Sequence, residues 1–375
     1  MAWVAFWLLI LFQPWLDWPH LLPVVSHRLT LVVCGLLLGL GQIGSTRRVS
    51  ALPWRWLVVA LGVGVVLFAH TGASVLDGGY LDHFQETALL SDGLLLLLAV
   101  VWGAWGLLQV PMRWFDQLPT VGTWLVLVNC GVALWQRGQS GEGVGLLGLD
   151  RYAGAYALCW LPIVWTTRRW VGVLAALCWL LLAGKLFPLV VACGVLGWLW
   201  ASRWRWSALA VLPLAVIVHQ GAWGLQVVQR AETWRNGLTA SIARPLLGWG
   251  FSPLAWAMLP ESYGYHLPSA HSDWIALVFH GGWLLLGVIG WGLWGTLRDR
   301  PRTPLARGLR ISLLASAVLA CVQDVVSDAR IGGLCLVFLV WWVREQTESA
   351  NAGAVGASAW RVSRVGVDRV GGPPV

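Results

Sequence analysis

Residues 273–296 read DWIALVFHGGWLLLGVIGWGLWGT, and the only charged side chain in this stretch is the first one. An apolar run of about 20 residues is long enough to cross the hydrocarbon core of a bilayer as a helix. Comparable runs recur along most of the 375 residues, of which 58% are hydrophobic and 11% are charged. Soluble domains are typically about 25% charged. The composition therefore excludes an ordinary soluble enzyme and predicts a polytopic membrane protein.

The apolar runs predict an all-α fold with about twelve transmembrane helices. The predicted membrane domain covers residues 1–344. The segment that follows, 345–375, is rich in Gly, Ala, Ser and Val without a periodic pattern, and we expect a disordered cytoplasmic tail. The predicted spans are residues 2–12, 29–44, 56–72, 93–110, 119–135, 151–166, 170–184, 186–201, 206–222, 273–296, 309–326 and 331–344.

The distribution of cations predicts which loops face the cytoplasm. The chain has 25 cationic residues, and all except Lys185 are Arg. Loops between successive spans alternate between two sides, and most of the cations fall on one of them. Cytoplasmic loops carry the excess of Lys and Arg, so this side and both termini are predicted to be cytoplasmic. The outer side carries only Arg28, Arg137, Arg151, Lys185, Arg230, Arg235, Arg244 and Arg330.

Several kinds of site are disfavoured by the sequence pattern. A net charge of +8 would suit nucleic acid, but the Arg residues form short clusters between apolar runs, which is a topology pattern. The sequence contains no HExxH, paired-His or CxxC pattern and no Gly-rich nucleotide loop. We therefore expect no metal, no cofactor and no nucleic-acid partner. The seven cysteines lie in or beside apolar runs and are predicted to pack as small apolar side chains.

One predicted outer loop, residues 223–272, is much longer than the others. Long loops on compact proteins are usually functional. This loop concentrates Arg230, Arg235 and Arg244 on an otherwise acidic side, and His271 lies near its end. Each Arg could bind a phosphate through two parallel charge-assisted hydrogen bonds. The alternative is that these side chains reach lipid headgroups.

Three motifs follow one another in this region. Arg230-Ala-Glu-Thr-Trp is followed by Arg244-Pro-Leu-Leu-Gly-Trp-Gly, and then by His271-Ser-Asp-Trp, which enters the span that contains His280-Gly-Gly. This order resembles the signature of the O-antigen ligase and polymerase superfamily. Its members show an Arg-x-x-x-Trp helix start, a Pro-Leu-x-Gly-x-Gly turn, and a His-Asn pair heading a span with a Glu-x-Gly-x-x-Gly pattern. The resemblance is carried by residues 230–290.

Three positions depart from the pattern of that family. Ser272 stands where the family has Asn after the His, and His280 stands where it has Glu before the glycines. The family often has a Ser-Arg-Gly stretch at the outer end of an earlier span, and here Lys185 stands in place of the Arg. Lysine remains a phosphate partner but lacks the bidentate fork of Arg.

The resemblance implies glycosyl transfer at the outer face of a bacterial inner membrane. The donor would be a glycan on undecaprenyl pyrophosphate, and the acceptor a sugar hydroxyl on lipid A-core or on another glycan chain. A single displacement at the anomeric carbon would invert its configuration, and the pyrophosphate leaving group makes a metal unnecessary. The implied roles are leaving-group stabilisation by Arg230 and proton abstraction by His271. The implied substrate-binding residues are Lys185, Arg235, Arg244, Gly248 and Gly250, the two glycines forming a turn with close backbone approach.

Each assignment has a plainer alternative that the sequence leaves open. Arg235 and Arg244 could pair with Glu232 or Glu261, and Ser272 or Asp273 could simply cap a helix. His280 lies well inside a predicted span and could make a buried hydrogen bond. The tryptophans Trp234, Trp249 and Trp256 suit sugar stacking, although interfacial anchoring is the stronger interpretation in a chain with 30 Trp.

Three functions remain open at this stage. The sequence does not separate a ligase from a polymerase, because both would use the same donor and the same motifs. A transporter should show polar or broken helices near the bilayer midplane, whereas the polar residues here gather at the outer edge. A thiol-dependent membrane protease is disfavoured, because no Cys falls with the outer Arg and His residues.

Overall fold

The computed structural model describes residues 2–7, 10–11, 27–40, 62–63, 101–141, 143–147, 150–183, 230–249, 272–298, 300–321, 323 and 331–347. All regular secondary structure in these ranges is helical, which confirms the predicted all-α class. The named elements are α1 (Ala2–Trp7), α2 (His27–Leu40), α5 (Met112–Phe115), α6 (Leu118–Ser140), the 3₁₀ turn η3 (Gly145–Leu147), α7 (Asp150–Thr166), α8 (Trp170–Leu182), α12 (Asp273–Leu297) and α13 (Pro304–Leu319). Further helices cover 101–109, 230–243 and 331–347.

Two helices in the described part of the chain are long and apolar enough to cross a membrane. They are Met112–Ser140, which joins α5 to α6, and Asp273–Gly295, which is most of α12. The shorter apolar helix α8 accompanies them. The count of twelve spans is not confirmed, because only these two helices of the described residues qualify. The predicted spans 186–201 and 206–222, and nearly all of 56–72, lie outside the described residues.

Two predicted boundaries near the C-terminus are wrong. Helix α13 begins at Pro304 rather than 309, because the Thr303 hydroxyl caps it by accepting a hydrogen bond from the Ala306 amide at 3.0 Å. The last helix runs to Thr347, beyond the predicted start of the tail at residue 345. Glu345 belongs to this helix and accepts a 2.7 Å hydrogen bond from Thr303, which holds the last turn against the start of α13.

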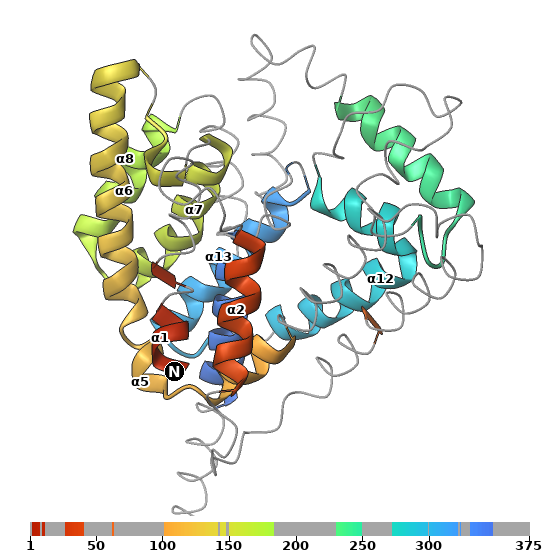
Figure 1. Cartoon of the computed structure of the whole chain (residues 1–375), viewed down its shortest axis with the longest axis horizontal. Helices are drawn as coiled ribbons and strands as arrows, with labels where there is room; N and C mark the ends of the chain where they lie inside the picture. The colour runs from red at the N-terminus through yellow and green to blue at the C-terminus, as the bar shows by residue number, and fades with distance from the viewer. Residues whose placement is uncertain are drawn as a thin grey trace, which may run out of the picture.

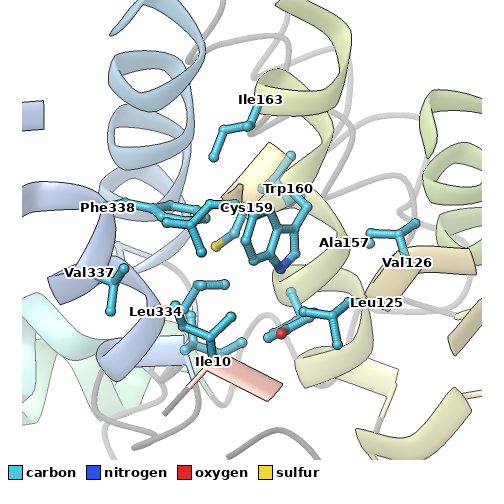
Figure 2. Packing of buried hydrophobic residues seen from close by; sticks show 14 of the residues in the cluster. Ile10, Leu125, Val126, Ala157, Cys159, Trp160, Ile163, Leu334, Val337 and Phe338 are labelled. Carbon is cyan, nitrogen blue, oxygen red and sulfur yellow. The ribbon is translucent and has the colours of Figure 1, made fainter. Parts of the chain in front are cut away.

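The core is built where α6, α7, α8 and α13 pack together with the helix 331–347. Trp160 of α7 is fully buried at its centre and packs edge-on against Phe338, with ring centroids 5.0 Å apart. Figure 2 shows Ile10, from the start of the chain, below this pair and next to Leu334. Gly122 of α6 provides the space for the indole, because a Cβ there would overlap the Trp160 ring.

Small residues bring α13 close to α7. Gly308, Ser312 and Ser316 repeat every fourth residue on α13, a spacing that lets helix backbones approach closely in membranes. A Cβ at Gly308 would lie 2.9 Å from the Pro162 carbonyl oxygen. The Ser312 hydroxyl donates a 2.6 Å hydrogen bond to the Cys159 carbonyl oxygen. Figure 1 shows α13 between the α6–α8 group and α12. The close packing of α13 on α7 therefore connects the core to the region of the predicted site.

Large apolar side chains cover the outward faces of α6 and α8. On α8 they follow helical spacing and form one stripe, whereas a soluble monomer rarely exposes such a large contiguous apolar patch. The stripe consists of Trp170, Val171, Leu174, Leu177 and Leu181, and α6 adds Trp124, Val128, Leu134 and Trp135. This surface is what a lipid-facing helix pair requires.

The turn between α7 and α8 carries an arginine in the left-handed region, with φ of 59° at Arg168. The Arg168 amide donates to Trp165 and the Arg169 amide to Val164, which is the Schellman hydrogen-bond pattern usually closed by glycine. Because a left-handed L-residue costs roughly 1–2 kcal/mol, we expect Arg168→Gly to raise the free energy of unfolding by about 1 kcal/mol. Thermal unfolding in detergent measures this effect.

The matched control is Arg169→Gly, which removes the same charge from a residue with a φ of −90°. No stabilisation is expected there, since no strain is relieved. Equal shifts for the two variants would attribute the effect to charge and contradict the backbone explanation.

Candidate functional site

The predicted outer loop contains a helix and a tight turn that pack against α12. The helix covers 230–243, and the turn 244–249 follows it at once. Figure 1 shows the helix in green beside the first half of α12. The motif segments that begin at Arg230 and Arg244 are therefore adjacent in space to the span that contains His280-Gly-Gly.

Helix α12 is broken at Gly282, which has φ of 75° and ψ of 177°. In a continuous helix the Trp283 amide would donate to the Phe279 carbonyl oxygen, four residues earlier. Here the Trp249 amide donates to Phe279 and the Trp283 amide donates to Pro245, both at 2.8 Å. The turn is thus inserted between the donor and the acceptor of one helical hydrogen bond, and this insertion causes the break. The predicted span 273–296 therefore contains a break that its apolar pattern does not indicate.

Two glycines make this insertion sterically feasible. Gly248 has φ of 70°, and a Cβ on it would lie 2.6 Å from the Gly282 nitrogen. A Cβ on Gly282 would overlap the Leu246 carbonyl group. The interpretation of Gly248 as a turn residue with close backbone approach is confirmed. Gly250 lies outside the described residues.

Trp249 fixes the turn to both of its neighbours. Its indole nitrogen donates a 2.8 Å hydrogen bond to the Ala240 carbonyl oxygen in the helix 230–243. Its ring lies nearly parallel to Phe279 of α12, and the Arg244 guanidinium lies 4.4 Å from the ring centroid. The position of Trp249 is therefore set by contacts within the protein, and Arg244 is placed by a cation–π contact.

Arg230 lies at the start of its helix, half-buried beside the end of α13. Its guanidinium donates a 3.1 Å hydrogen bond to the side-chain oxygen of Gln323, which is 2% exposed. This bond orients the guanidinium. Sequence reasoning missed Gln323. The available signal was a polar side chain within the predicted apolar span 309–326, where such groups are costly.

The start of α12 meets the same end of α13. The Ser272 hydroxyl accepts from the Ile275 amide and donates to the Ala320 carbonyl oxygen, and the Asp273 amide donates to that oxygen at 2.9 Å. The interpretation of Ser272 as a helix cap is confirmed. Arg230 bonds to Gln323 and Ser272 bonds to Ala320, which is three residues before Gln323 in the chain. The start of the helix 230–243 and the start of α12 therefore meet the same end of α13, and His271 directly precedes Ser272 in the sequence.

Of the remaining residues of interest, Arg235 and His280 are described by the structure, whereas His271 and Lys185 are not. Arg235 is largely exposed and lies 3.8 Å from Glu232 one turn earlier, as the ion-pair alternative anticipated. His280 is half-buried, two residues before the break, and its ring centroid lies 5.0 Å from that of Phe279. His271 and Lys185 lie outside the described residues. Their roles stay predictions.

The arrangement offers a permanent cation and an ordered helix start at one end of α12 and α13, and a locked turn that docks nine residues further along α12. Such groups can stabilise charge that develops on a phosphate leaving group. Within the described ranges, no group of three or more His, Cys, Asp or Glu side chains is placed to hold a metal ion.

No protein-family model and no curated protein matches the chain. The likeness to the O-antigen ligase and polymerase superfamily therefore rests on the motif residues themselves.

Proposed function

We propose that the chain is a polytopic membrane glycosyltransferase of the O-antigen ligase type. It would transfer a glycan from undecaprenyl pyrophosphate to a sugar hydroxyl of lipid A-core, at the outer face of the bacterial inner membrane and with inversion at the anomeric carbon. About twelve spans with both termini cytoplasmic belong to this proposal, as the cation distribution favours.

One observation carries the proposal. The Pro-Leu-Leu-Gly-Trp turn and the His-Gly-Gly segment resemble two separate motifs of the family, yet the Trp249 amide donates to the Phe279 carbonyl oxygen and the Trp283 amide donates to the Pro245 carbonyl oxygen. Motifs that form a site should lie together, whereas chance matches have no reason to do so. The same packing holds the helix that begins at Arg230 against α12 and α13.

The proposed chemistry uses the residues as follows. The acceptor hydroxyl attacks the anomeric carbon while the bond to the pyrophosphate oxygen breaks, and the negative charge on that oxygen is stabilised by Arg230. His271 takes the proton of the attacking hydroxyl. Lys185, Arg235 and Arg244 would add positive potential that attracts the anionic donor.

The break in α12 favours a second candidate, a transporter, because transporters bind substrates at discontinuous helices. In such proteins the released backbone groups coordinate the cargo. Here the released groups of Phe279 and Trp283 are both bonded to the turn 244–249. This pairing supports a structural purpose for the break and leaves glycosyl transfer as the preferred function. A polymerase of the same superfamily uses the same site with a glycan acceptor.

Glycan transfer by the purified protein in liposomes tests the proposal, with an undecaprenyl-pyrophosphate glycan donor and lipid A-core as acceptor. Transfer to lipid A-core is the expected result. In a deletion strain, long chains retained on the carrier indicate a ligase, whereas shortened chains indicate a polymerase. Unchanged glycans in both pools, together with no transfer in vitro, would reject the function.

Arg230→Ala is expected to lower the rate of transfer. One charge-assisted hydrogen bond is worth roughly 1.5–3 kcal/mol, which corresponds to about a 10- to 150-fold loss if it acts at the transition state. Arg230→Lys should recover part of the rate, since it restores the charge without the fork. Initial rates of glycan transfer at saturating donor measure both effects.

Arg137→Ala is the matched control, because Arg137 is an exposed cation on the same predicted side, at the end of α6. It should retain the wild-type rate. An equal loss in both variants would indicate a general charge effect, and full activity of a well-folded Arg230→Ala protein would remove Arg230 from the mechanism.

A further inference from the structure

The helix 230–243 and its turn expose a row of large apolar side chains. Leu238, Ile242 and Leu246 are 37%, 69% and 68% exposed. Leu238 and Ile242 are four residues apart, so they lie on one line along the helix, and Leu246 is exposed in the turn that follows the helix. We call these three residues the apolar edge.

Polar groups occupy the adjoining part of the helix surface. Thr239 and Glu232 lie roughly 100° around the helix from Leu238. Arg235 lies between this polar pair and the apolar edge, and its side chain is 74% exposed. The opposite side, which includes Thr233, Asn236, Ala240 and Ser241, is buried against the protein. The exposed surface is therefore divided lengthwise into an apolar part and a charged part. This division is typical of a helix that lies in a membrane interface.

Exposed apolar side chains also occur on α12 next to the turn. The backbone of Leu246 lies against Gly282 at the break, and Trp283 and Leu284, which follow the break, are exposed. Gly282 lies about 13 Å along the helix axis from the start of α12, at 1.5 Å per residue. The hydrocarbon core of a bilayer is about 30 Å thick, and the 25 residues of α12, broken at Gly282, reach at most about 37 Å. A turn that docks at Gly282 therefore reaches below the membrane surface if α12 spans the bilayer.

We propose that the apolar edge is inserted in the outer leaflet of the bilayer, with Leu238, Ile242 and Leu246 against lipid acyl chains. Arg235 and Arg244 flank the edge, and both suit anionic headgroups. Arg230 at the start of this helix is then held at the membrane surface, the depth at which the pyrophosphate of a lipid carrier lies. The inference rests on the membrane-spanning part of the proposed function and is independent of glycosyl transfer.

Site-directed spin labelling tests the insertion. Single cysteines are introduced as Ile242→Cys, Leu246→Cys and Thr239→Cys in a Cys321→Ser background, because Cys321 is exposed. Leu174→Cys reports on the outward stripe of α8. Each labelled protein is reconstituted in vesicles of phosphatidylethanolamine and phosphatidylglycerol. Collision rates with oxygen, which concentrates in lipid, and with a water-soluble nickel chelate are measured, and the Cys321→Ser parent provides the blank.

We expect labels at residues 242, 246 and 174 to collide mainly with oxygen, and the label at 239 to collide mainly with nickel. The ratio of the two rates should differ several-fold between 242 and 239. If the label at 242 collides mainly with nickel while the label at 174 collides mainly with oxygen, the insertion of the apolar edge is overturned, but the protein still spans the membrane. Nickel collisions at 174 as well would overturn both. Spin–spin broadening at 242 would show a second copy of the chain on this surface, which also overturns the proposal.

Discussion

Gly282→Ala is expected to separate the turn 244–249 from α12. The residue has φ of 75° and ψ of 177°, a region populated almost only by glycine, and a Cβ would overlap the Leu246 carbonyl group. Backbone strain and overpacking each cost about 1–3 kcal/mol, so the free energy of unfolding should fall by about 3 kcal/mol or more, or the turn should undock. Thermal unfolding measures the first outcome, and amide exchange of the segment 244–249 measures the second.

Gly287→Ala and Gly290→Ala are the controls on the same helix. A Cβ at either position meets nothing within 4 Å, and Ala is favoured over Gly in a helix interior by roughly 0.5–1 kcal/mol. Both variants should match or exceed the wild-type stability and keep the amides of 244–249 protected. If Gly282→Ala behaves like these two, the inserted turn does not hold α12 in its broken form.

His271→Ala is expected to have the largest effect on catalysis. His271 directly precedes Ser272, whose hydroxyl caps α12 beside the end of α13. Loss of a general base lowers turnover by about 10²–10⁴-fold, whereas donor binding should change little, because a neutral imidazole adds no charge against pyrophosphate. The wild-type rate should fall on the acid side, because an imidazole that has already taken up a proton cannot accept one from the attacking hydroxyl. Turnover against pH with a lipid-pyrophosphate donor measures both.

Ser272→Ala is the matched control for this experiment. It removes the cap, which costs about 1 kcal/mol of stability, without removing an imidazole. Its turnover at saturating acceptor should stay close to that of the wild type. If His271→Ala keeps most of its turnover, or shows the same acid limb as the wild type, the cations alone would stabilise the leaving group and His271 would only order the segment.

The described helices could be located largely from the sequence. The predicted spans 119–135, 151–166 and 170–184 overlap α6, α7 and α8, because uninterrupted apolar runs are separated by polar residues and turns. The start of α13 at Pro304 was missed, since Arg307 interrupts the apolar run although Thr303 and Pro304 form a standard helix start.

The contacts of the candidate site could be predicted only in part. The Pro-Leu-x-Gly-x-Gly pattern identified Gly248 as a turn residue, because local turn chemistry is encoded locally. The break at Gly282 was not predictable, since Gly287 and Gly290 occur in the same helix without one and the difference depends on a distant partner. The bond between Arg230 and Gln323 joins residues 93 positions apart, a distance over which no sequence periodicity applies.

The backbone groups of α12 at the break can form either of two sets of hydrogen bonds, and the shape of the helix depends on which set forms. The docked turn forms two hydrogen bonds, from Trp249 to Phe279 and from Trp283 to Pro245. A straightened α12 would regain one bond and leave the Trp249 amide and the Pro245 carbonyl to find water. Water supplies those partners readily, whereas hydrocarbon does not. The bent form is therefore favoured most strongly inside lipid, and solvent exposure shifts the balance toward a straight helix. In the proposed membrane location, the bilayer would therefore stabilise the docked turn against the straight helix.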